Sequence, residues 1–368
     1  MTHERTIRVL CITDGGDRPT IATFIGMHQR GIAITVIYPP GRPNMPLLHA
    51  AGVPVIDLPI RRNFDRRAIA ALRAELDRGR YQIVHTFTNK GISNALIAVR
   101  GRNVRVVAYR GIVGAVSFLD PVSWMRYLNP RIDRIICVCE AIRRHFLEMK
   151  PGFLAMPAER PVTIYKGHRI EWYDQPPADL TTLGLPDDAF VITCVANYRP
   201  RKGVEVLVEA MARLPADIPA QLLLVGHMDA PKLSRCIARS PARDRIHRLG
   251  YRADAPAISA ASDVFCLPST KREGLARAII EAMAYGVPAV VTDSGGSPEL
   301  VVDGESGYVV PIFDAQALAD AFERLYRDPA LRQRMGAAAR QRIALDFRNE
   351  TTIEKTIELY RSLLADSG

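Results

Sequence analysis

The sequence predicts an α/β protein with two doubly wound domains, each a parallel sheet covered by helices on both faces. The chain has 368 residues, which corresponds to two domains at roughly 150 residues each. Short, almost uninterrupted apolar runs, typical of strands buried on both faces, alternate with helical stretches along the chain. That alternation pauses once, around residues 167–188, and then begins again.

In the first domain, apolar runs predict the strands and the stretches between them predict the connecting helices. The expected strands are Ile7–Thr13, Ile32–Tyr38, Val53–Leu58, Ile83–Phe87, Val104–Tyr109 and Arg134–Val138. The expected helices are Thr20–Arg30 and Arg66–Arg78. Because a helix connects consecutive strands of this kind, the strands are expected to run parallel.

The domain boundary is expected near residue 180, so that the domains comprise residues 1–180 and 181–349. Around it, Gln175-Pro176-Pro177 and Leu185-Pro186-Asp187-Asp188 favour turns. The strands expected in the second domain are Phe190–Ala196, Gln221–Val225, Arg245–Leu249, Val264–Leu267 and Ala289–Thr292. The helices expected there are Val204–Leu214 and Leu275–Tyr285.

A last helix is expected over residues 350–368. Ile353, Ile357, Tyr360 and Leu364 form one apolar stripe on it. Such a stripe fits simple packing on the second domain, and it also fits a helix that crosses back to fasten the first. We expect the crossing.

Composition excludes several classes of protein. With 48% hydrophobic and 24% charged residues, the chain is unlike a disordered, collagen-like or disulfide-scaffold protein. No apolar run reaches the about 18 residues of a membrane-spanning helix. The polar segment Met1–Arg8 leads directly into a predicted strand, so we expect no signal peptide and a cytoplasmic protein.

The six cysteines are expected to be buried thiols. They lie mostly in apolar runs, and no two have the CxxC spacing of a redox or zinc motif. Cys137 and Cys139 would share one face of a strand, but no second pair of ligands lies nearby. We therefore expect no metal site.

Positive charge is concentrated in the first half of the chain. The whole chain has a net charge of +10, whereas residues 1–170 hold 26 Lys and Arg against 12 Asp and Glu, a net +14. A basic half attracts nucleic acid, an anionic membrane or an acidic substrate, or is merely a solvated arginine-rich surface. The sequence has no helix-turn-helix, RNP or zinc pattern, so we expect no nucleic-acid partner.

Two glutamates eight residues apart, Glu273 and Glu281, form the most informative motif. If residues 273–281 were helical throughout, they would span about 12 Å, close to the distance from a nucleotide's ribose to the sugar beyond its diphosphate. Carboxylates accept paired hydrogen bonds from vicinal hydroxyls. The amides of Leu275, Ala276 and Arg277 are expected at the helix N-terminus, where they would face a diphosphate. Taken alone, the glutamates would be ordinary helix and surface charges.

Two further loops lie where ligands bind in such sheets, beyond the carboxyl ends of strands. Asn197 to Gly203 follows the first strand of the second domain, and Arg201 and Lys202 in it are placed to neutralise a departing diphosphate. Asp293-Ser294-Gly295-Gly296-Ser297-Pro298-Glu299 follows a later strand.

Arg201-Lys202-Gly203, the Glu273/Glu281 pair, Ala282 to Pro288 and Gly295-Gly296-Ser297-Pro298-Glu299 together resemble the group-one (family four) retaining glycosyltransferases of GT-B fold. The resemblance covers nearly the whole chain. It implies two Rossmann-like domains that face each other across a cleft, the first binding the acceptor and the second a nucleotide-sugar donor.

The resemblance also implies roles for individual residues. Arg201, Lys202 and Glu273 would be catalytic, with the two cations at the donor phosphates and Glu273 at the transferred sugar. Glu281 would hold the ribose. The other implied donor-binding residues are Gly15, Gly16, Asn197, Tyr251, Arg252, Gly274, Leu275, Ala276 and Arg277. Gly250-Tyr251-Arg252 falls where the family grips the base.

The acceptor side matches the family less closely. Gly15 and Gly16 follow the first strand, where the family has a glycine loop, and Arg18 and His85 are candidates to contact the acceptor. His85 is equally compatible with a structural role. Many relatives have His-Gly where this chain has Arg110-Gly111, so Arg110 is the third candidate.

The implied activity is the metal-independent transfer of a hexose, with retention of configuration, from a nucleoside diphosphate sugar to a saccharide. No cofactor is expected, because the nucleotide-sugar is a substrate. UDP is favoured over GDP on family habit. A GT-B-fold UDP-sugar 2-epimerase and a soluble metabolic glycosyltransferase are the alternatives, and a basic nucleic-acid-binding protein is a remote one.

The acceptor is expected to be lipid-linked or part of a lipopolysaccharide core, O-antigen or exopolysaccharide. Residues 112–128 are apolar and aromatic, with Trp124 and Tyr127 near Arg126, Arg131 and Arg134. Such a segment fits an anionic membrane surface, and it also fits packing under a surface helix. Residues 61–67, rich in arginine, would add to the membrane contact. We therefore expect a peripheral protein on the cytoplasmic face of the inner membrane.

Overall fold

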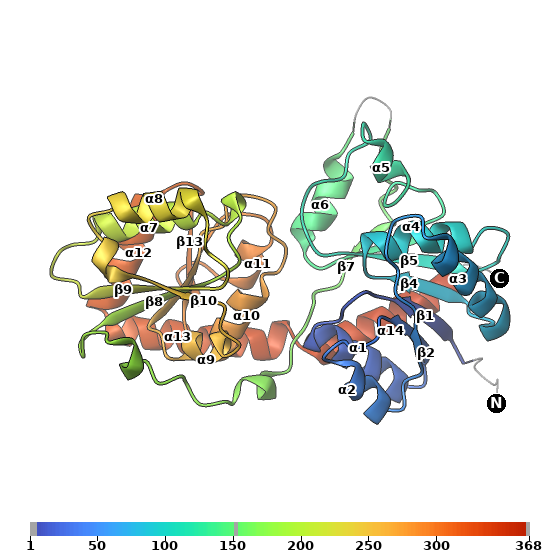
Figure 1. Cartoon of the computed structure of the whole chain (residues 1–368), viewed down its shortest axis with the longest axis horizontal. Helices are drawn as coiled ribbons and strands as arrows, with labels where there is room; N and C mark the ends of the chain where they lie inside the picture. The colour runs from blue at the N-terminus through green and yellow to red at the C-terminus, as the bar shows by residue number, and fades with distance from the viewer. Residues whose placement is uncertain (1–5, 151–153, 366–368) are drawn as a thin grey trace. The chain divides into compact units, whose positions relative to one another are not determined.

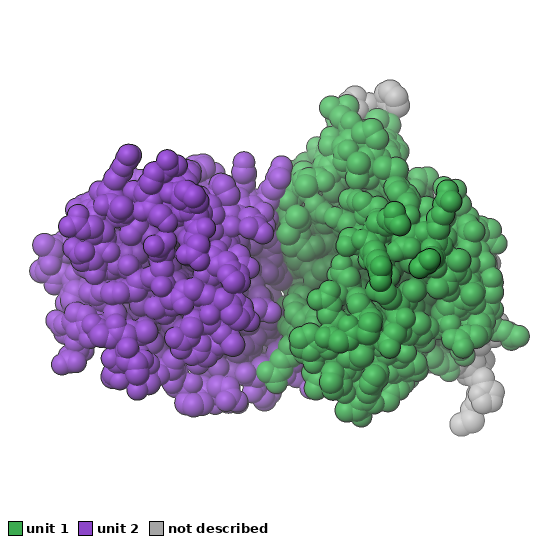
Figure 2. All heavy atoms as spheres, in the orientation of Figure 1, with its two compact units in different colours: residues 1–167, 349–368 green, residues 168–348 purple. Residues whose placement is uncertain are grey.

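The computed structural model describes residues 6–150 and 154–365. Two expected features lie outside the described residues. They are residues 1–5 of the polar N-terminal segment and residues 366–368 at the end of the last helix. The chain forms two compact units, Met1–Gly167 with Asn349–Gly368, and His168–Arg348 (Figure 2). Each is a parallel sheet with helices on both faces (Figure 1), which confirms the predicted fold class.

The first unit has a seven-stranded sheet in the order β3-β2-β1-β4-β5-β6-β7, and each neighbouring pair is parallel. The strands are β1 (Arg8–Ile12), β2 (Ala33–Tyr38), β3 (Val55–Asp57), β4 (Ile83–Thr86), β5 (Arg105–Arg110), β6 (Arg134–Cys137) and β7 (Pro161–Thr163). The helices are α1 (Arg18–Gln29), α2 (Met45–Ala50), α3 (Arg66–Gly79), α4 (Asn89–Ala98), α5 (Pro121–Trp124), α6 (Glu140–Glu148) and α14 (Asn349–Ala365). The strand order changes direction between the neighbouring strands β1 and β4, although the strands themselves stay parallel. Sheets of this kind bind ligands at such a switch point.

The second unit has a six-stranded sheet in the order β10-β9-β8-β11-β12-β13, also parallel. The strands are β8 (Phe190–Val195), β9 (Ala220–Val225), β10 (Ile246–Gly250), β11 (Val264–Leu267), β12 (Ala289–Thr292) and β13 (Gly307–Val310). The helices are α7 (Val204–Arg213), α8 (Pro231–Arg239), α9 (Ala255–Ala260), α10 (Arg277–Ala284), α11 (Ser297–Leu300), α12 (Ala315–Arg327) and α13 (Pro329–Asp346). Four of its strands, β8, β9, β11 and β12, are almost wholly buried, as their apolar sequences predict.

The last helix, α14, belongs to the core of the first unit. Ile353 and Tyr360 are fully buried there among side chains of β1, β2 and α1. Gly26 of α1 makes the close approach possible, because a Cβ at that position would lie 2.2 Å from Cδ1 of Ile353. Residues at the far end of the sequence therefore complete the first unit.

The first unit ends at Gly167, earlier than the expected boundary near residue 180. Residues 168–180 lie in the second unit because they are tied to it. The His168 amide donates to the Phe347 carbonyl at 2.7 Å, and Leu180 packs against a cluster that includes Leu223 and Ile258. Turn-forming prolines mark irregular structure but do not show to which core it is attached.

In the described part of the chain, no helix is both long and apolar enough to cross a membrane.

Candidate active site

Three loops meet at the carboxyl edge of the second unit's sheet. They follow β8, β11 and β12, and they touch through backbone atoms. The Thr270 amide donates to the Arg201 carbonyl at 2.7 Å. Gly203 and Gly295 both have a positive φ, and a Cβ on either would come within 2.0 Å of a carbonyl oxygen, that of Pro268 or Glu273 respectively. Glycine is therefore required at both positions for the loops to pack this closely.

Lys202 and Glu273 form an ion pair between two of these loops. Nζ of Lys202 lies 2.6 Å from Oε2 of Glu273, and their side chains are only 16% and 11% exposed. The Ser269 hydroxyl donates to the same oxygen at 2.6 Å. Within the described residues, Oε1 of Glu273 makes no hydrogen bond, so it can accept one from a ligand hydroxyl.

Helix α10 begins at Arg277, so the expected helix start at Leu275 is wrong. Arg272 has a φ of 60°, Ala276 is extended, and the Gly296 amide donates to the Glu273 carbonyl at 3.2 Å. Residues 273–276 are therefore a loop shaped by contacts with residues 295–296. The helical span of about 12 Å between the two glutamates does not apply.

This start also changes the expected set of amides. Leu275 and Ala276, with Gly274, precede the helix, and only Arg277 lies in its first turn. Glu281 lies one turn further on, and its Oε1 is 3.2 Å from Nε of Arg277. The Glu281 side chain is 15% exposed and that of Arg277 is 61% exposed, so the carboxylate is the more deeply set of the pair.

Arg201 is partly buried, and its Nε is a buried donor with no partner among the described residues. An unpaired buried guanidinium nitrogen is costly unless a ligand or solvent reaches it. This observation agrees with a site that accepts an anion beside Lys202.

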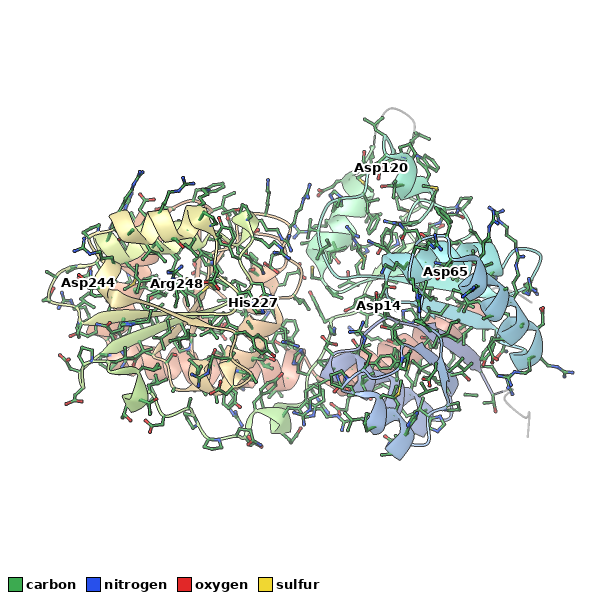
Figure 3. All side chains as sticks on the ribbon, in the orientation of Figure 1. Asp14, Asp65, Asp120, His227, Asp244 and Arg248 are labelled. Atoms are coloured by element: carbon green, nitrogen blue, oxygen red, sulfur yellow. The ribbon has the colours of Figure 1, made fainter. Side chains whose placement is uncertain are left out.

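Two exposed rings lie at the ends of neighbouring strands β9 and β10. Tyr251 is 68% exposed and stacks on His227, with ring centroids 5.5 Å apart and planes at 13°. The sequence analysis did not identify His227, which is labelled in Figure 3. Its position just after strand β9, where ligands bind in such sheets, is the one signal that could have identified it as a candidate.

Asn197 and Arg252 serve local contacts in this structure. Oδ1 of Asn197 accepts the His227 amide at 3.1 Å, which braces one loop against the next. The Arg252 guanidinium pairs with Asp254 at 2.7 Å.

The remaining predicted residues lie in the first unit. Gly15 and Gly16 follow β1, and the Gly16 amide donates to the Tyr38 hydroxyl at 3.2 Å. Arg18 is the first residue of α1. Its neighbour Asp17 caps that helix by accepting from the Thr20 amide.

Asp17 also forms an ion pair that the sequence did not reveal. Its Oδ2 lies 2.6 Å from Nζ of Lys166. Burial raises the pKa of Asp17, but Lys166 and the hydrogen bonds from Thr20 lower it more, so the net shift is downward. Burial lowers the pKa of Lys166, but its interactions with Tyr109 and Asp17 raise it more. Both groups are therefore charged at neutral pH.

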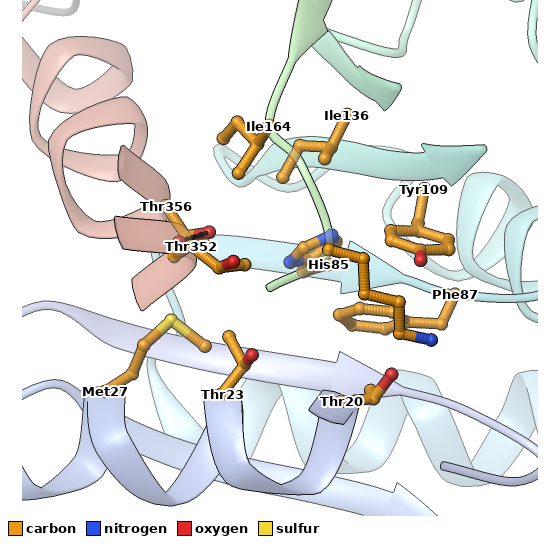
Figure 4. A pocket seen from close by; sticks show the side chains of 11 residues that line it. Thr20, Thr23, Met27, His85, Phe87, Tyr109, Ile136, Ile164, Thr352 and Thr356 are labelled. Carbon is orange, nitrogen blue, oxygen red and sulfur yellow. Dashed lines mark hydrogen bonds between the residues drawn. The ribbon is translucent and has the colours of Figure 1, made fainter. Parts of the chain in front are cut away.

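His85 lies inside the first unit, with 2% of its surface exposed. Its Nδ1 is 2.7 Å from the Tyr360 hydroxyl of α14. The ring points into a cavity of about 30 Å³ lined also by residues of α1, β5 and α14 (Figure 4). That volume suits about one water, and Nε2 has no partner among the described residues. The alternative of a structural histidine, which the sequence left open, is the one this position favours.

Burial lowers the pKa of His85 from 6.5 to about 3. Between these values the unfolded chain binds a proton that the folded chain does not, so the free energy of unfolding falls as the pH falls. We expect His85→Gln to remove about 2 kcal/mol of the stability difference between about pH 7.5 and pH 5. Chemical denaturation at the two pH values measures it. His49→Gln, at an exposed histidine of the same unit, is the control. If the wild-type protein and both variants showed the same pH dependence of stability, His85 would not be a buried neutral histidine.

Arg110 is also buried, with 5% of its surface exposed. Nε donates to the Ile112 carbonyl at 3.0 Å, the terminal nitrogen NH2 donates to the Gly114 carbonyl, and the guanidinium lies 4.8 Å from the centre of the Tyr127 ring. Two of its nitrogens thus shape the loop after β5. The contact of Arg110 with an acceptor stays a prediction.

Comparison with known proteins decides the family. Residues 178–342 match the family described as Glycosyl transferases group 1, and residues 15–172 match Glycosyltransferase Family 4. The chain belongs to the group 1, family 4 glycosyltransferases. This finding confirms the resemblance inferred from Lys202, the two glutamates and the Gly295-Gly296 loop.

The curated relatives of this glycosyltransferase include two bacterial enzymes. It is 31% identical over 195 residues to the N-acetyl-alpha-D-glucosaminyl L-malate synthase of Bacillus anthracis, covering 51% of this chain and 50% of that one. It is 32% identical over 185 residues to the lipopolysaccharide core biosynthesis glycosyltransferase LpsE of Rhizobium meliloti, covering 50% and 53%. These matches span about half the length of each relative.

Solved structures confirm the GT-B fold. A glycosyltransferase from Rickettsia africae superposes with a TM-score of 0.82 at 20% identity, covering 98% of this chain and 99% of that one. Anabaena HepE in complex with UDP and glucose superposes with a TM-score of 0.79 at 22% identity, covering 97% and 100%.

Proposed function

We propose that this glycosyltransferase moves a hexose, with retention of configuration, from a nucleoside diphosphate sugar to a saccharide acceptor. The observation that carries the proposal is the cluster of Lys202, Glu273 and Ser269 at the carboxyl edge of the second unit's sheet. It combines a cation for phosphate with a carboxylate oxygen, Oε1 of Glu273, that makes no hydrogen bond within the described residues.

In the proposed donor complex, Lys202 and Arg201 contact the diphosphate. Glu273 accepts hydrogen bonds from hydroxyls of the transferred sugar, and Glu281 accepts them from the ribose. The exposed Tyr251 ring, backed by His227, supplies a face on which a base stacks. Gly274 to Arg277 supply backbone amides near the diphosphate.

The proposed reaction breaks the bond between C1 of the hexose and the phosphate oxygen and forms a bond from C1 to the acceptor oxygen on the same face. The proton of the acceptor hydroxyl passes to the departing diphosphate oxygen. Lys202 and Arg201 stabilise the negative charge that develops on that oxygen, where electrostatic catalysis counts most. The proposal requires neither a metal nor a cofactor.

UDP is the favoured nucleotide. The HepE structures that share this fold were solved with UDP and with UDP-glucose. One curated relative from Corynebacterium glutamicum is named as GDP-mannose-dependent, which makes GDP the second candidate.

We further propose a lipid-linked or lipopolysaccharide-type acceptor and peripheral contact with the cytoplasmic face of the inner membrane. Apolar side chains around α5 support this, since Leu119 is 85%, Trp124 40% and Met125 42% exposed. The net charge of +14 over residues 1–170 adds attraction to anionic lipid. Equal recovery in soluble and membrane fractions at low salt would count against this part of the proposal.

Thermal shift against UDP-, GDP-, ADP- and CMP-sugars and the free nucleotides tests the donor. A ligand that binds the folded state alone raises the melting temperature. We expect a selective shift with one nucleotide and at least tenfold weaker binding in Glu281→Ala, which removes the carboxylate assigned to the ribose.

Glu209→Ala is the matched control for that test, because Glu209 also pairs with an arginine four residues away, in the same unit, at 56% exposure. No shift with any nucleotide would remove the basis of the proposal. An epimerised nucleotide-sugar formed without an acceptor would indicate the 2-epimerase instead. Transfer to a soluble sugar alone would indicate a metabolic glycosyltransferase.

A further inference from the structure

A basic hollow lies in the first unit between β3 and the first turn of α3. Its volume is about 730 Å³, and it is lined by Leu58, Pro59 and residues 61–68 except Asn63. Four arginines, Arg61, Arg62, Arg66 and Arg67, are exposed around it. A hollow of this size accommodates a phosphorylated group rather than a single ion.

The charge of this basic hollow is only partly neutralised within the protein, because its lining includes four guanidiniums and one carboxylate, that of Asp65. Across residues 6–150 and 154–365, the four guanidiniums enter no ion pair and no hydrogen bond. The one acidic residue among them, Asp65, is used by the backbone, since its carboxylate accepts the Ala68 amide at 3.3 Å and the Arg61 amide at 3.2 Å. Guanidiniums without partners are suited to bidentate recognition of phosphate oxygens.

The segment that carries the arginines is held in place by α4. The Asp65 amide donates to Oδ1 of Asn94 at 2.9 Å, and Nδ2 of Asn94 donates to the Arg62 carbonyl at 2.8 Å. Asn94 is fully buried. The backbone of the basic hollow is therefore set before a ligand arrives, which lowers the entropic cost of binding.

The same helix also contacts the apolar segment around α5. Nε of Arg126 donates to the Ser93 hydroxyl at 3.2 Å, and the Tyr127 hydroxyl donates to Oδ1 of Asn89 at 3.1 Å. Figure 1 shows α4 between α3 and α5. The segment of the basic hollow and the segment that carries the exposed Leu119, Trp124 and Met125 thus both contact α4. An anionic group carried on an apolar chain would find both kinds of surface on this unit.

We propose that the basic hollow binds a phosphate or diphosphate group, with Arg62 and Arg66 as its main ligands and the half-exposed Phe64 ring as an apolar wall. This inference rests on the proposed function for the source of the group, because an acceptor would reach the carboxyl edge of this sheet. A lipid-linked acceptor and a phospholipid headgroup offer the same chemistry, and the experiment separates them.

The test uses the full-length chain, inorganic pyrophosphate as the soluble probe, and vesicles of phosphatidylcholine with or without phosphatidic acid. The variant is Arg62→Gln with Arg66→Gln. The control is Arg80→Gln with Arg100→Gln, which changes the net charge equally at two exposed arginines of the same unit. Binding of pyrophosphate is measured by calorimetry at constant ionic strength, and binding of vesicles by flotation.

We expect the variant to bind pyrophosphate at least tenfold more weakly than the control, which keeps wild-type affinity. If only the phosphatidic acid vesicles separate variant from control, the source is a lipid headgroup, and the site still stands. If variant and control behave alike with both probes, the proposal is wrong. Neither probe needs a donor, so this result can be judged even if no nucleotide binds, which is the outcome that would defeat the proposed function.

Discussion

Lys202→Ala is expected to lower kcat by about 10²- to 10³-fold, the loss typical of removing one group that stabilises a developing oxyanion. The side chain of Lys202 is held within hydrogen-bonding distance of Glu273, at 2.6 Å, and is largely screened from solvent. Its charge therefore acts in a medium where electrostatic interactions are stronger than in water. The melting temperature without ligand is measured beside kcat, because Glu273 loses one of its two partners.

Two further variants test whether the lost activity is due to the missing charge of Lys202. Lys202→Arg keeps the charge and is expected to retain more activity than the alanine variant. Lys232→Ala removes a lysine of the same unit that is 69% exposed and pairs with Glu205 at 3.3 Å, so its kcat is expected to stay within about twofold, as for an exposed ion pair. A Lys202→Ala enzyme with more than half the wild-type kcat would exclude the proposed role.

Ile353→Ala is expected to destabilise the first unit by about 3 kcal/mol. Ile353 is fully buried, and its Cδ1 fills the space above Gly26 of α1 that any larger residue would occupy. Removing three carbons there leaves a cavity between α1 and α14 that neither helix can close alone. The first unit consists of residues 1–167 together with α14 and the residues after it, so the lost stability is that of residues 1–167 packed on α14.

The two tryptophans of the chain allow the units to be followed separately in urea. Trp124 lies in the first unit and Trp172 in the second, so each Trp→Phe variant leaves one reporter. Ile353→Ala should lower the urea midpoint reported by Trp124 and leave that of Trp172 unchanged. Leu345→Ala, at a residue that is 59% exposed, should change neither by more than about 0.5 kcal/mol. A lowered midpoint at Trp172 alone would show that α14 stabilises the second unit instead.

The strands were the most predictable part of this fold. Strands such as β8, β9 and β12 are buried on both faces, so almost every residue is apolar and the run is visible without an alignment. The short edge strands β7 and β13 were missed. Each has few residues, and β13 begins at Gly307, whose close approach to Ala289 is a long-range contact.

At the candidate site, the sequence predicted which residues to consider but not the shape of their loops. Arg201 and Lys202 were singled out by their place between a strand and a helix, and Glu273 and Glu281 by their spacing, and their roles toward a donor stay predictions. The start of α10 was placed two residues early, because the contact of Gly295 with the Glu273 backbone leaves no mark in the local sequence. His227 and Lys166 were missed for the same reason, since their partners are distant in the chain.

By itself, the sequence determined that this protein has two parallel α/β halves and a basic first half, since these depend on residue type and local periodicity. The glycosyltransferase motif set in the second half was recognised by its resemblance to a known family. Only the tertiary structure decided that α14 completes the first unit, that His85 and Arg110 are turned inward, and that Asn94 holds four arginines around one hollow. These features depend on packing and hydrogen bonds between residues that are far apart in the sequence. Such contacts form only when the chain is folded, so they leave no local pattern in the sequence.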